Sequence, residues 1–431
     1  MFTQQVNSLI RSWIWRLLFL GAAGLSCSRQ AQDSVTVVFW AMGNEGENVQ
    51  KLIPGFEKEN PGIRVRVQQI PWTAAHEKLL TAYAGNSLPD MCQLGNTWVP
   101  EFSMLNGLED LDPWVEGSGV VKPEKYFTGI WETNVIDSSS FGIPWYVDTR
   151  VLYYRKDIFE RAGYSRPPKT WKEWFDLAQK IKRTAGEDNY AVFLPTNEWA
   201  PFVAAGLQAG SSLLKDNNQY GDFSGPEFTE SFKFLLTFYQ DKLAPVGITH
   251  VTSIYQGIAD GFFAMYITGP WNIGEFRRRL PDHLQDQWMT APLPGPDENR
   301  PGVSLAGGSS LVLFRSSERK AEAWKFVEYL SRVDQQVAFY EITGNLPAVR
   351  EAWNDTSLAN NRYIRAFYDQ MEHVVPTPKI PEWEQIAMKV QQYAEAASMN
   401  LLTAEDALEQ LDRDVNNILE KRRWMIARGR Q

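Results

Sequence analysis

One stretch of the chain, residues 141–154, carries three kinds of side chain that bind polyhydroxylated molecules. Its aromatic and β-branched residues predict a β-strand. Side chains of a strand alternate between its two faces, so Tyr146, Asp148 and Arg150 share one face. That face offers a flat ring for stacking, a carboxylate acceptor and a planar donor, which together suit a sugar-sized polyol. We expect this strand to cross between two lobes, with its polar face on a cleft.

Tryptophan is the second source of binding chemistry. The chain has 17 tryptophans, and many lie in segments without helical periodicity. Those expected in loops are Trp40, Trp98, Trp199 and Trp271. Indoles at such positions can cover the C–H faces of a pyranose, while Glu45 and Asp148 would accept hydrogen bonds from its hydroxyls. Arg150 would act as a donor or would orient Asp148. Core packing is the alternative explanation for an indole, and it is favoured for Trp171 and Trp174.

The elements that must position these residues follow an α/β pattern. Residues 35–40 form a continuous apolar run typical of a buried strand, followed by a loop at 41–47 and a helix that Pro54 kinks. An alternating strand at 63–67 completes a βαβ unit, and a further strand at 91–94 follows the next helix. In parallel sheets, ligands collect at the carboxyl ends of strands. Residues 40–45 and 96–98 occupy that place.

The later chain continues the pattern. Thr170 and Glu173 form a capping box that begins a helix, and a strand at 261–269 leads to Pro270 at a first helical position. A Pro/Gly-rich linker at 292–296 precedes a strand entered through paired glycines at 307–308. A long amphipathic helix begins at Thr403 and ends the chain.

Length, charge and cysteine content exclude several classes of protein. A chain of 431 residues predicts two domains, and interspersed charges with a net charge of −9 exclude a nucleic-acid partner. The four histidines lack metal-ligand spacing, so we expect no metal and no cofactor. No Gly-x-Ser-x-Gly nucleophile motif is present.

The first 27 residues read as a targeting segment. Arg11 and Arg16 precede an apolar run at 17–25 that is too short to span a bilayer. The run ends in Gly24-Leu25-Ser26-Cys27, which resembles a bacterial lipobox, although its leucine stands one position later than usual. We expect lipidation of Cys27, with ordinary signal cleavage nearby as the alternative. Either outcome exports the protein, and lipidation would leave Cys92 as the single free thiol, with no disulfide possible.

Taken in order, several windows resemble the extracellular sugar-binding proteins of ABC importers, a group that includes the maltodextrin-binding proteins. The similar stretches are Phe39-Trp40 with the loop that follows, 56–65, 85–90, 142–154, 169–171, 265–271, and 307–308 followed by 321–330. Each motif is weak alone, but the ordered series spans roughly residues 35 to 420.

The resemblance implies a two-lobed periplasmic-binding-protein-like α/β fold, in which each lobe is a mostly parallel sheet flanked by helices and crossing strands form the hinge. Lobe 1 would comprise 33–144 plus 304–346, and lobe 2 would comprise 145–303 plus 347–431. A sugar in the interlobe cleft would close the lobes, and the closed form would dock on an ABC permease in the membrane. The protein would act as a monomer at the periplasmic or extracytoplasmic face, anchored through Cys27.

The residues and the resemblance together give one set of candidate ligand-binding positions. These are Trp40, Asn44, Glu45, Trp72, Asn96, Thr97, Trp98, Tyr146, Asp148, Arg150, Trp199, Trp271, Asn272 and Gly308. Two rival functions stay open. An exported glycan hydrolase would use Glu45 and Asp148 as its paired carboxylates. A surface adhesion or scaffold module would need repeats or disulfides, which the sequence lacks.

Overall fold

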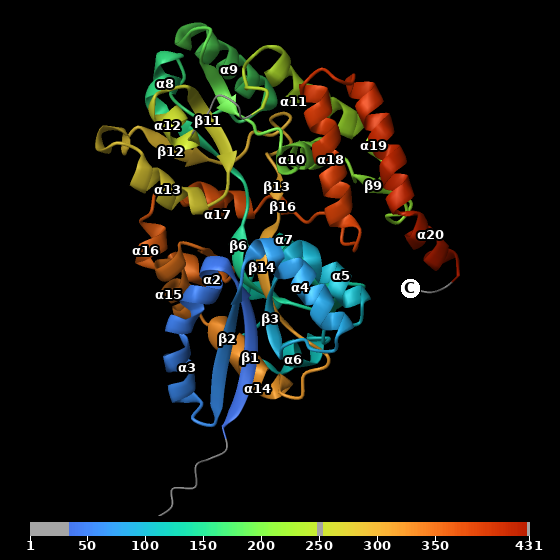
Figure 1. Cartoon of the computed structure of the whole chain (residues 1–431). Coiled ribbons are helices and arrows are strands. Elements are labelled where there is room, and N and C mark those ends of the chain that lie inside the picture. Colours follow the sequence, from blue (N-terminus) through green and yellow to red (C-terminus); the bar gives the residue numbers. More distant parts are fainter. Residues whose placement is uncertain (1–33, 248–252, 429–431) are drawn as a thin grey trace, which may run out of the picture.

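The computed structural model describes residues 34–247 and 253–428. Within them the chain forms two bodies, one above the other in Figure 1, each built on a central β-sheet covered by helices. We call the body on the six-stranded sheet lobe 1 and the body on the four-stranded sheet lobe 2. The predicted two-lobed α/β fold is therefore confirmed.

Lobe 1 has the strand order β15-β6-β14-β3-β1-β2. Its strands are β1 (Val35–Met42), β2 (Ile63–Ile70), β3 (Met91–Gly95), β6 (Ile143–Asp148), β14 (Gly307–Leu313) and β15 (Leu346–Pro347), with a small ribbon of β4 (Val135–Ile136) and β5 (Ser139–Ser140). Its helices are α2 (Gly43–Asn48), α3 (Ile53–Glu59), α4 (Trp72–Ala84), α5 (Val99–Met104), α6 (Asp112–Gly117), α7 (Thr128–Glu132), α14 (Lys320–Leu330), α15 (Val333–Thr343) and α16 (Thr356–Ala359).

Lobe 2 has the strand order β12-β7-β11-β8. Its strands are β7 (Val151–Arg155), β8 (Tyr190–Phe193), β11 (Phe263–Thr268) and β12 (Trp288–Ala291), with a ribbon of β9 (Leu214–Lys215) and β10 (Tyr220–Gly221). Its helices are α8 (Lys156–Arg161), α9 (Trp171–Ala185), α10 (Ala200–Ala209), α11 (Pro226–Gln240), α12 (Ile254–Ala259), α13 (Trp271–Arg279), α17 (Arg365–Met371), α18 (Trp383–Ser398), α19 (Ala404–Ile418) and α20 (Glu420–Ala427).

The window that the sequence predicts to cross between lobes does so, but as two strands. β6 belongs to the lobe 1 sheet and β7 to the lobe 2 sheet, with Thr149 and Arg150 between them. Thr149 is fully buried and donates to the carbonyl oxygen of Leu305, so the chain turns there instead of continuing one strand. The backbone returns to lobe 1 through β13 (Ser304–Leu305), which pairs in parallel with β16 (Val374–Val375).

The sheets are mixed, which corrects the expectation of mostly parallel sheets. β1 pairs in parallel with β2 and β3, but β14 pairs antiparallel with both β3 and β6. The antiparallel pairing of β14 arises because the chain crosses back from lobe 2 into lobe 1 before this strand. β14 enters lobe 1 from the cleft, whereas β1, β3 and β6 run towards the cleft, so their carboxyl ends still meet there as predicted.

Three local expectations are also corrected. The predicted loop at 41–47 is the end of β1 followed by α2, because β1 continues two residues past Trp40. Pro270 is the residue before α13 rather than its first residue. β6 and β15 extend the lobe 1 sheet slightly beyond 144 and 346. The lobe boundaries as a whole stay a prediction.

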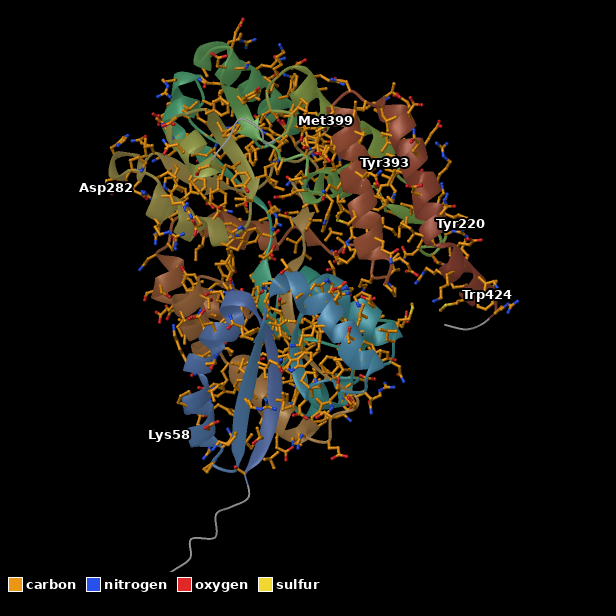
Figure 2. The ribbon with its side chains drawn as sticks, in the orientation of Figure 1. Lys58, Tyr220, Asp282, Tyr393, Met399 and Trp424 are labelled. Carbon is orange, nitrogen blue, oxygen red and sulfur yellow. The ribbon has the colours of Figure 1, made fainter. Side chains whose placement is uncertain are left out.

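The predicted helix signals in lobe 2 have the expected roles. Thr170 caps α9 by accepting a hydrogen bond from the amide of Glu173, and Trp171 and Trp174 are buried in the lobe core. Thr403 caps α19, whose apolar face packs against α18. Figure 2 labels Tyr393 on α18, Met399 directly after the end of α18, and Trp424 on α20 at the outer edge of the molecule.

Candidate functional site

A cleft of about 520 Å³ lies between the lobes and takes side chains from both. Most of the predicted ligand-binding residues line it: Glu45, Trp72, Asn96, Thr97, Trp98, Tyr146, Asp148, Arg150, Trp199, Trp271 and Gly308. These positions are far apart in sequence, and the carboxyl ends of β1, β3 and β6 bring the lobe 1 members together. The cleft is large enough for a small-molecule ligand.

Three predicted residues do not line the cleft. Trp40 is 8% exposed and packs in the core between the lobe 1 sheet and α4, where Lys78 covers its ring. Asn44 is exposed and accepts a hydrogen bond from Asn48 on the next turn of α2. Asn272 is 3% exposed and bonds to Thr268 and Tyr255. Its place on α13, one residue after Trp271, turns it into lobe 2.

On the lobe 1 side, Glu45 is the best-supported carboxylate. It stands in the first turn of α2 and is 9% exposed. The indole N–H of Trp72 donates to its Oε2 at 3.3 Å, and Asn345 Nδ2 donates to its Oε1 at 2.9 Å. A carboxylate this buried needs such donors, and they fix both the acid and the Trp72 ring.

Tyr146 sits at the floor of the cleft within a closed hydrogen-bond network. Its hydroxyl is 3.1 Å from Gln93 Nε2 and 3.0 Å from Ser309 Oγ. Burial raises the pKa of Tyr146 well above its usual value of 10, and the nearby Glu45 carboxylate raises this pKa further. Tyr146 is therefore a neutral hydroxyl at any physiological pH.

At the crossing, Asp148, Arg150 and Trp271 form one cluster. Arg150 Nη1 donates to Asp148 Oδ1 at 3.0 Å, and its guanidinium lies 4.6 Å from the centre of the Trp271 ring. Trp271 is 48% exposed, so part of the indole remains available to a ligand. Gly269 makes this ring position possible, because a Cβ at residue 269 would stand 2.1 Å from the indole.

Asn96, Thr97 and Trp98 follow β3 as predicted. Asn96 Oδ1 accepts from Ser310, while its buried Nδ2 has no hydrogen-bond partner among the described residues. The Trp98 ring meets Trp72 edge to face at 5.7 Å.

Behind Trp98 lies His76, whose ring centre is 5.1 Å from the Trp98 ring centre. A 2.5 Å hydrogen bond to Glu101 is the largest cause that raises the pKa of His76 above 6.5, against the lowering effect of burial. Trp98 thus rests on a histidine whose protonated form is favoured by Glu101.

Sequence reasoning missed several cleft residues. They include Ser309, Asn345, Thr377 and Glu384. Asn345 follows the left-handed Gly344 that ends α15, and Glu384 is the second residue of α18. Neither lies at a strand end, so the rule that locates Asn96 or Glu45 gives no signal for them.

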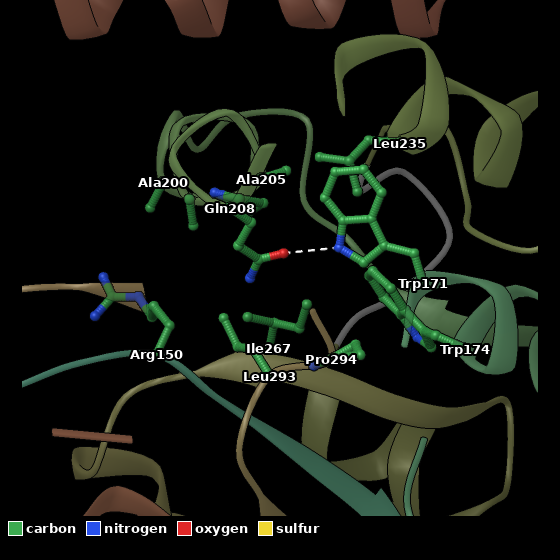
Figure 3. Close-up of a pocket in the computed structure, with 12 residues that line it drawn as sticks. Arg150, Trp171, Trp174, Ala200, Ala205, Gln208, Leu235, Ile267, Leu293 and Pro294 are labelled. Atoms are coloured by element: carbon green, nitrogen blue, oxygen red, sulfur yellow. Dashed lines mark hydrogen bonds between the residues drawn. The ribbon is translucent and has the colours of Figure 1, made fainter. Parts of the chain in front are cut away.

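Trp171 and Trp174 line a second, small cavity inside lobe 2, so these two tryptophans have a packing role and not a sugar-binding one. Figure 3 shows the Trp171 indole donating a hydrogen bond to Gln208, with Trp174 next to Trp171 and Arg150 on the opposite side of the cavity. This hydrogen bond is 2.7 Å long. The cavity holds about 20 Å³, which is room for one water molecule. The expectation that Trp171 and Trp174 pack in the core is confirmed.

Residues 42–337 match the family model described as bacterial extracellular solute-binding protein. The chain belongs to the bacterial extracellular solute-binding protein family. Among solved structures, this solute-binding protein resembles the sugar-binding protein MalE from Xanthomonas citri, with 47% identity and a TM-score of 0.89 over 91% of this chain and 99% of that one.

Two further relatives agree with this membership. An ABC transporter solute-binding protein from Thermotoga lettingae, solved with α-D-tagatose bound, is 29% identical, with a TM-score of 0.74 over 90% of this chain and 100% of that one. The diacetylchitobiose binding protein DasA of Streptomyces coelicolor is 27% identical over 81% of each chain. These relatives are named for binding, not for catalysis.

The described residues of this solute-binding protein were compared with the requirements of a membrane-spanning helix and of a metal site. Among the described residues, no helix combines the length and hydropathy needed to cross a bilayer. In the same residues no group of three or more His, Cys, Asp or Glu side chains could hold a metal ion. Cys27 and the predicted targeting segment lie outside the described residues.

Proposed function

We propose that this protein captures a neutral sugar, a di- or oligosaccharide or a glycoside, in the interlobe cleft and delivers it to an ABC permease. The observation that carries this proposal is the composition of the cleft. Indoles from lobe 1 (Trp72, Trp98) and from lobe 2 (Trp199, Trp271) line one hollow together with carboxylates.

The binding chemistry follows from these groups. Each indole can cover one face of a sugar ring, and burying that apolar area contributes about 25 cal/mol per Å², with a further increment for stacking. Glu45 and Asp148 accept hydroxyl hydrogens, and charge-assisted hydrogen bonds are the stronger kind. Contacts from both lobes exist together when the lobes are close, so the sugar shifts the population towards a closed form.

The relatives support a sugar as the ligand class. The Xanthomonas citri protein is named as sugar-binding, the Thermotoga lettingae structure holds tagatose, and the Streptomyces coelicolor protein is named for diacetylchitobiose. The family supports delivery to permease subunits of an ABC importer. We place the protein at the extracytoplasmic face of the membrane, as a monomer.

The anchor is a separate part of the proposal. A lipid on Cys27 would tether lobe 1, because the described chain begins with β1 directly after the amino-terminal segment. Replacing Cys27 with Ser should release the protein from the membrane fraction. Retention of that variant in the membrane fraction would show that another feature anchors it.

The protein acts as a binder and not as a hydrolase. Asp148 is paired with Arg150, and Glu45 is held by Trp72 and Asn345, so each carboxylate has partners that suit a fixed acceptor. A glycosidase would need one of the two as a general acid and the other as a nucleophile or base.

A thermal-shift and tryptophan-fluorescence titration against a panel of neutral sugars tests the function. A ligand of the folded state raises the melting temperature as its concentration exceeds Kd, and a binder returns the sugar intact. Cleaved sugar in the recovered sample would favour the hydrolase. A panel without any stabilising sugar would contradict capture of a sugar.

A further inference from the structure

Glu384 differs from the other carboxylates of the cleft because it belongs to helix α18 of lobe 2 and has few hydrogen-bond donors around it. The charged residues that line the cleft are Glu45, Asp148, Arg150 and Glu384. Asp148 and Arg150 neutralise each other, and Glu45 already accepts from two donors. Glu384 accepts one hydrogen bond, and no ion pair joins it to a Lys or Arg of the described residues, although its charge helps to raise the pKa of His76 behind Trp98. Since an ionised carboxylate offers about four acceptor positions, most of its capacity is unused.

The position of Glu384 is fixed by its helix. It is the second residue of α18, a helix of 16 residues, where the helix dipole favours a negative charge. The preceding Trp383 is fully buried, which anchors the backbone at this end of α18. Trp199, which also lines the cleft, packs edge to face on Trp383 at 5.7 Å. A cleft indole and a cleft carboxylate of lobe 2 therefore share one buried support.

The one hydrogen bond that Glu384 makes crosses the cleft. Thr97 of lobe 1 donates to its Oε1 at 2.5 Å. A sugar hydroxyl is chemically the same kind of donor as the Thr97 side chain. The contact thus shows that the carboxylate reaches a hydroxyl held on the opposite wall of the cleft.

We infer that Glu384 is a further sugar-contact residue that sets ligand specificity, an inference that rests on the proposed function. It accepts hydrogen bonds from ligand hydroxyls beside the Thr97 hydroxyl and supplies negative charge that no cation of the cleft cancels. The cleft as a whole carries one positive and three negative side chains. It therefore selects neutral sugars over sugar acids, and Glu384 is the group whose replacement should relax that selection.

A structural role as a brace between the lobes predicts a different pattern of effects. If Glu384 served only to hold Thr97, removing either partner would have the same consequence. If it contacts the sugar through its charge, Glu384→Gln changes the preference between charged and neutral sugars, whereas Thr97→Val does not. The ratio of Kd values for a sugar acid and a neutral sugar therefore separates the two roles.

The experiment is calorimetric titration of the full mature protein with maltose, trehalose, N,N′-diacetylchitobiose and maltobionate, a sugar acid. For the tightest neutral sugar, Glu384→Gln should raise Kd about tenfold or more, as expected for the loss of a hydrogen bond to a charged group. Thr97→Val also removes a hydroxyl that lines the cleft, but it keeps the Glu384 charge, so it should leave the ratio of Kd values between maltobionate and the neutral sugar unchanged. The same Glu384→Gln variant should narrow the ratio of Kd values between maltobionate and the neutral sugar.

The matched control is Glu405→Gln. Glu405 is likewise the second residue of its helix, α19, but it pairs with Lys233 away from the cleft, so the control should bind as the unmodified protein does. The same change of the Kd ratio in Glu384→Gln and Thr97→Val, or no loss of affinity in Glu384→Gln, would overturn the inference while Trp271→Ala still weakens binding. If no neutral sugar binds, the proposed function and the inference fall together.

Discussion

The two walls of the cleft are built differently. On the lobe 1 wall, Glu45, Trp72 and Asn345 are joined by hydrogen bonds, and Tyr146 is tied to its neighbours. On the lobe 2 wall, Trp271 is nearly half exposed and rests on the Arg150 guanidinium. The first wall is organised before a ligand arrives, and the second leaves apolar surface open. A sugar would be oriented by lobe 1 and covered by lobe 2 as the lobes close.

The largest effect is expected from the organised wall. Glu45→Ala removes an acceptor for a sugar hydroxyl and leaves the Trp72 and Asn345 donors unpaired. Each loss of this kind is worth about 1–3 kcal/mol, so affinity should fall roughly 100-fold. Calorimetric titration gives the change in Kd, and Glu45→Gln should lose less because its amide oxygen can still accept. An equal loss in both variants would show that charge, not the hydrogen-bond arrangement, organises this wall.

A smaller effect is expected from the open wall. Trp271→Ala removes an exposed indole face, which should cost about 2 kcal/mol of binding, or roughly 30-fold, with little change in the free energy of unfolding. Trp424→Ala is the control, because Trp424 is 46% exposed but lies on α20 at the outer edge of the molecule. Fluorescence titration of both variants checks the result. Similar behaviour of the two variants would remove Trp271 from the site.

Gly269, whose backbone lies against the Trp271 indole, allows a test of the position of that ring. A methyl group at residue 269 would collide with the Trp271 ring, so Gly269→Ala should displace the ring and weaken binding. The displaced ring loses part of its contact area, so we expect a loss of about five- to tenfold. Gly274→Ala, on helix α13 together with Trp271, has no atom within 4 Å of the added Cβ and should bind normally. Normal binding by Gly269→Ala would mean that the ring position seen here is not needed.

The smallest effect is expected on the pH dependence of stability, through His76 behind the lobe 1 wall of the cleft. Because the pKa of His76 is raised in the folded protein, protonated His76 contributes stability that is complete below pH 6.5. That contribution is lost as pH rises through the raised pKa. His76→Asn should flatten the dependence of melting temperature on pH above pH 6.5, an effect under about 1 kcal/mol for a partly exposed pair. His283→Asn is the control, and an unchanged profile in His76→Asn would contradict the role of the Glu101 pair.

Much of this molecule could be predicted from local sequence. Alternation placed Tyr146 and Asp148 on one face, and both line the cleft, because period-2 geometry holds wherever a strand forms. The strand-end rule found Glu45, Asn96 and Trp98, since these residues follow β1 and β3 directly. The same rule placed Trp40 in the cleft because the predicted strand ended two residues too early.

The remainder depends on contacts that no local pattern contains. Glu384 meets Thr97 across 287 residues, and Asn345 meets Glu45 across 300. The antiparallel direction of β14 follows from the chain's passage through lobe 2, not from its own residues. Such pairings are set by the packing of whole lobes.

The central claim is that a neutral sugar is held by both walls at once. A crystal structure of the protein with the sugar selected by the panel tests it most directly. The account predicts a sugar ring between the Trp72–Trp98 side and Trp271, within hydrogen-bond distance of Glu45 or Asp148. A sugar bound outside the cleft, or touching one lobe alone in a closed molecule, would contradict it.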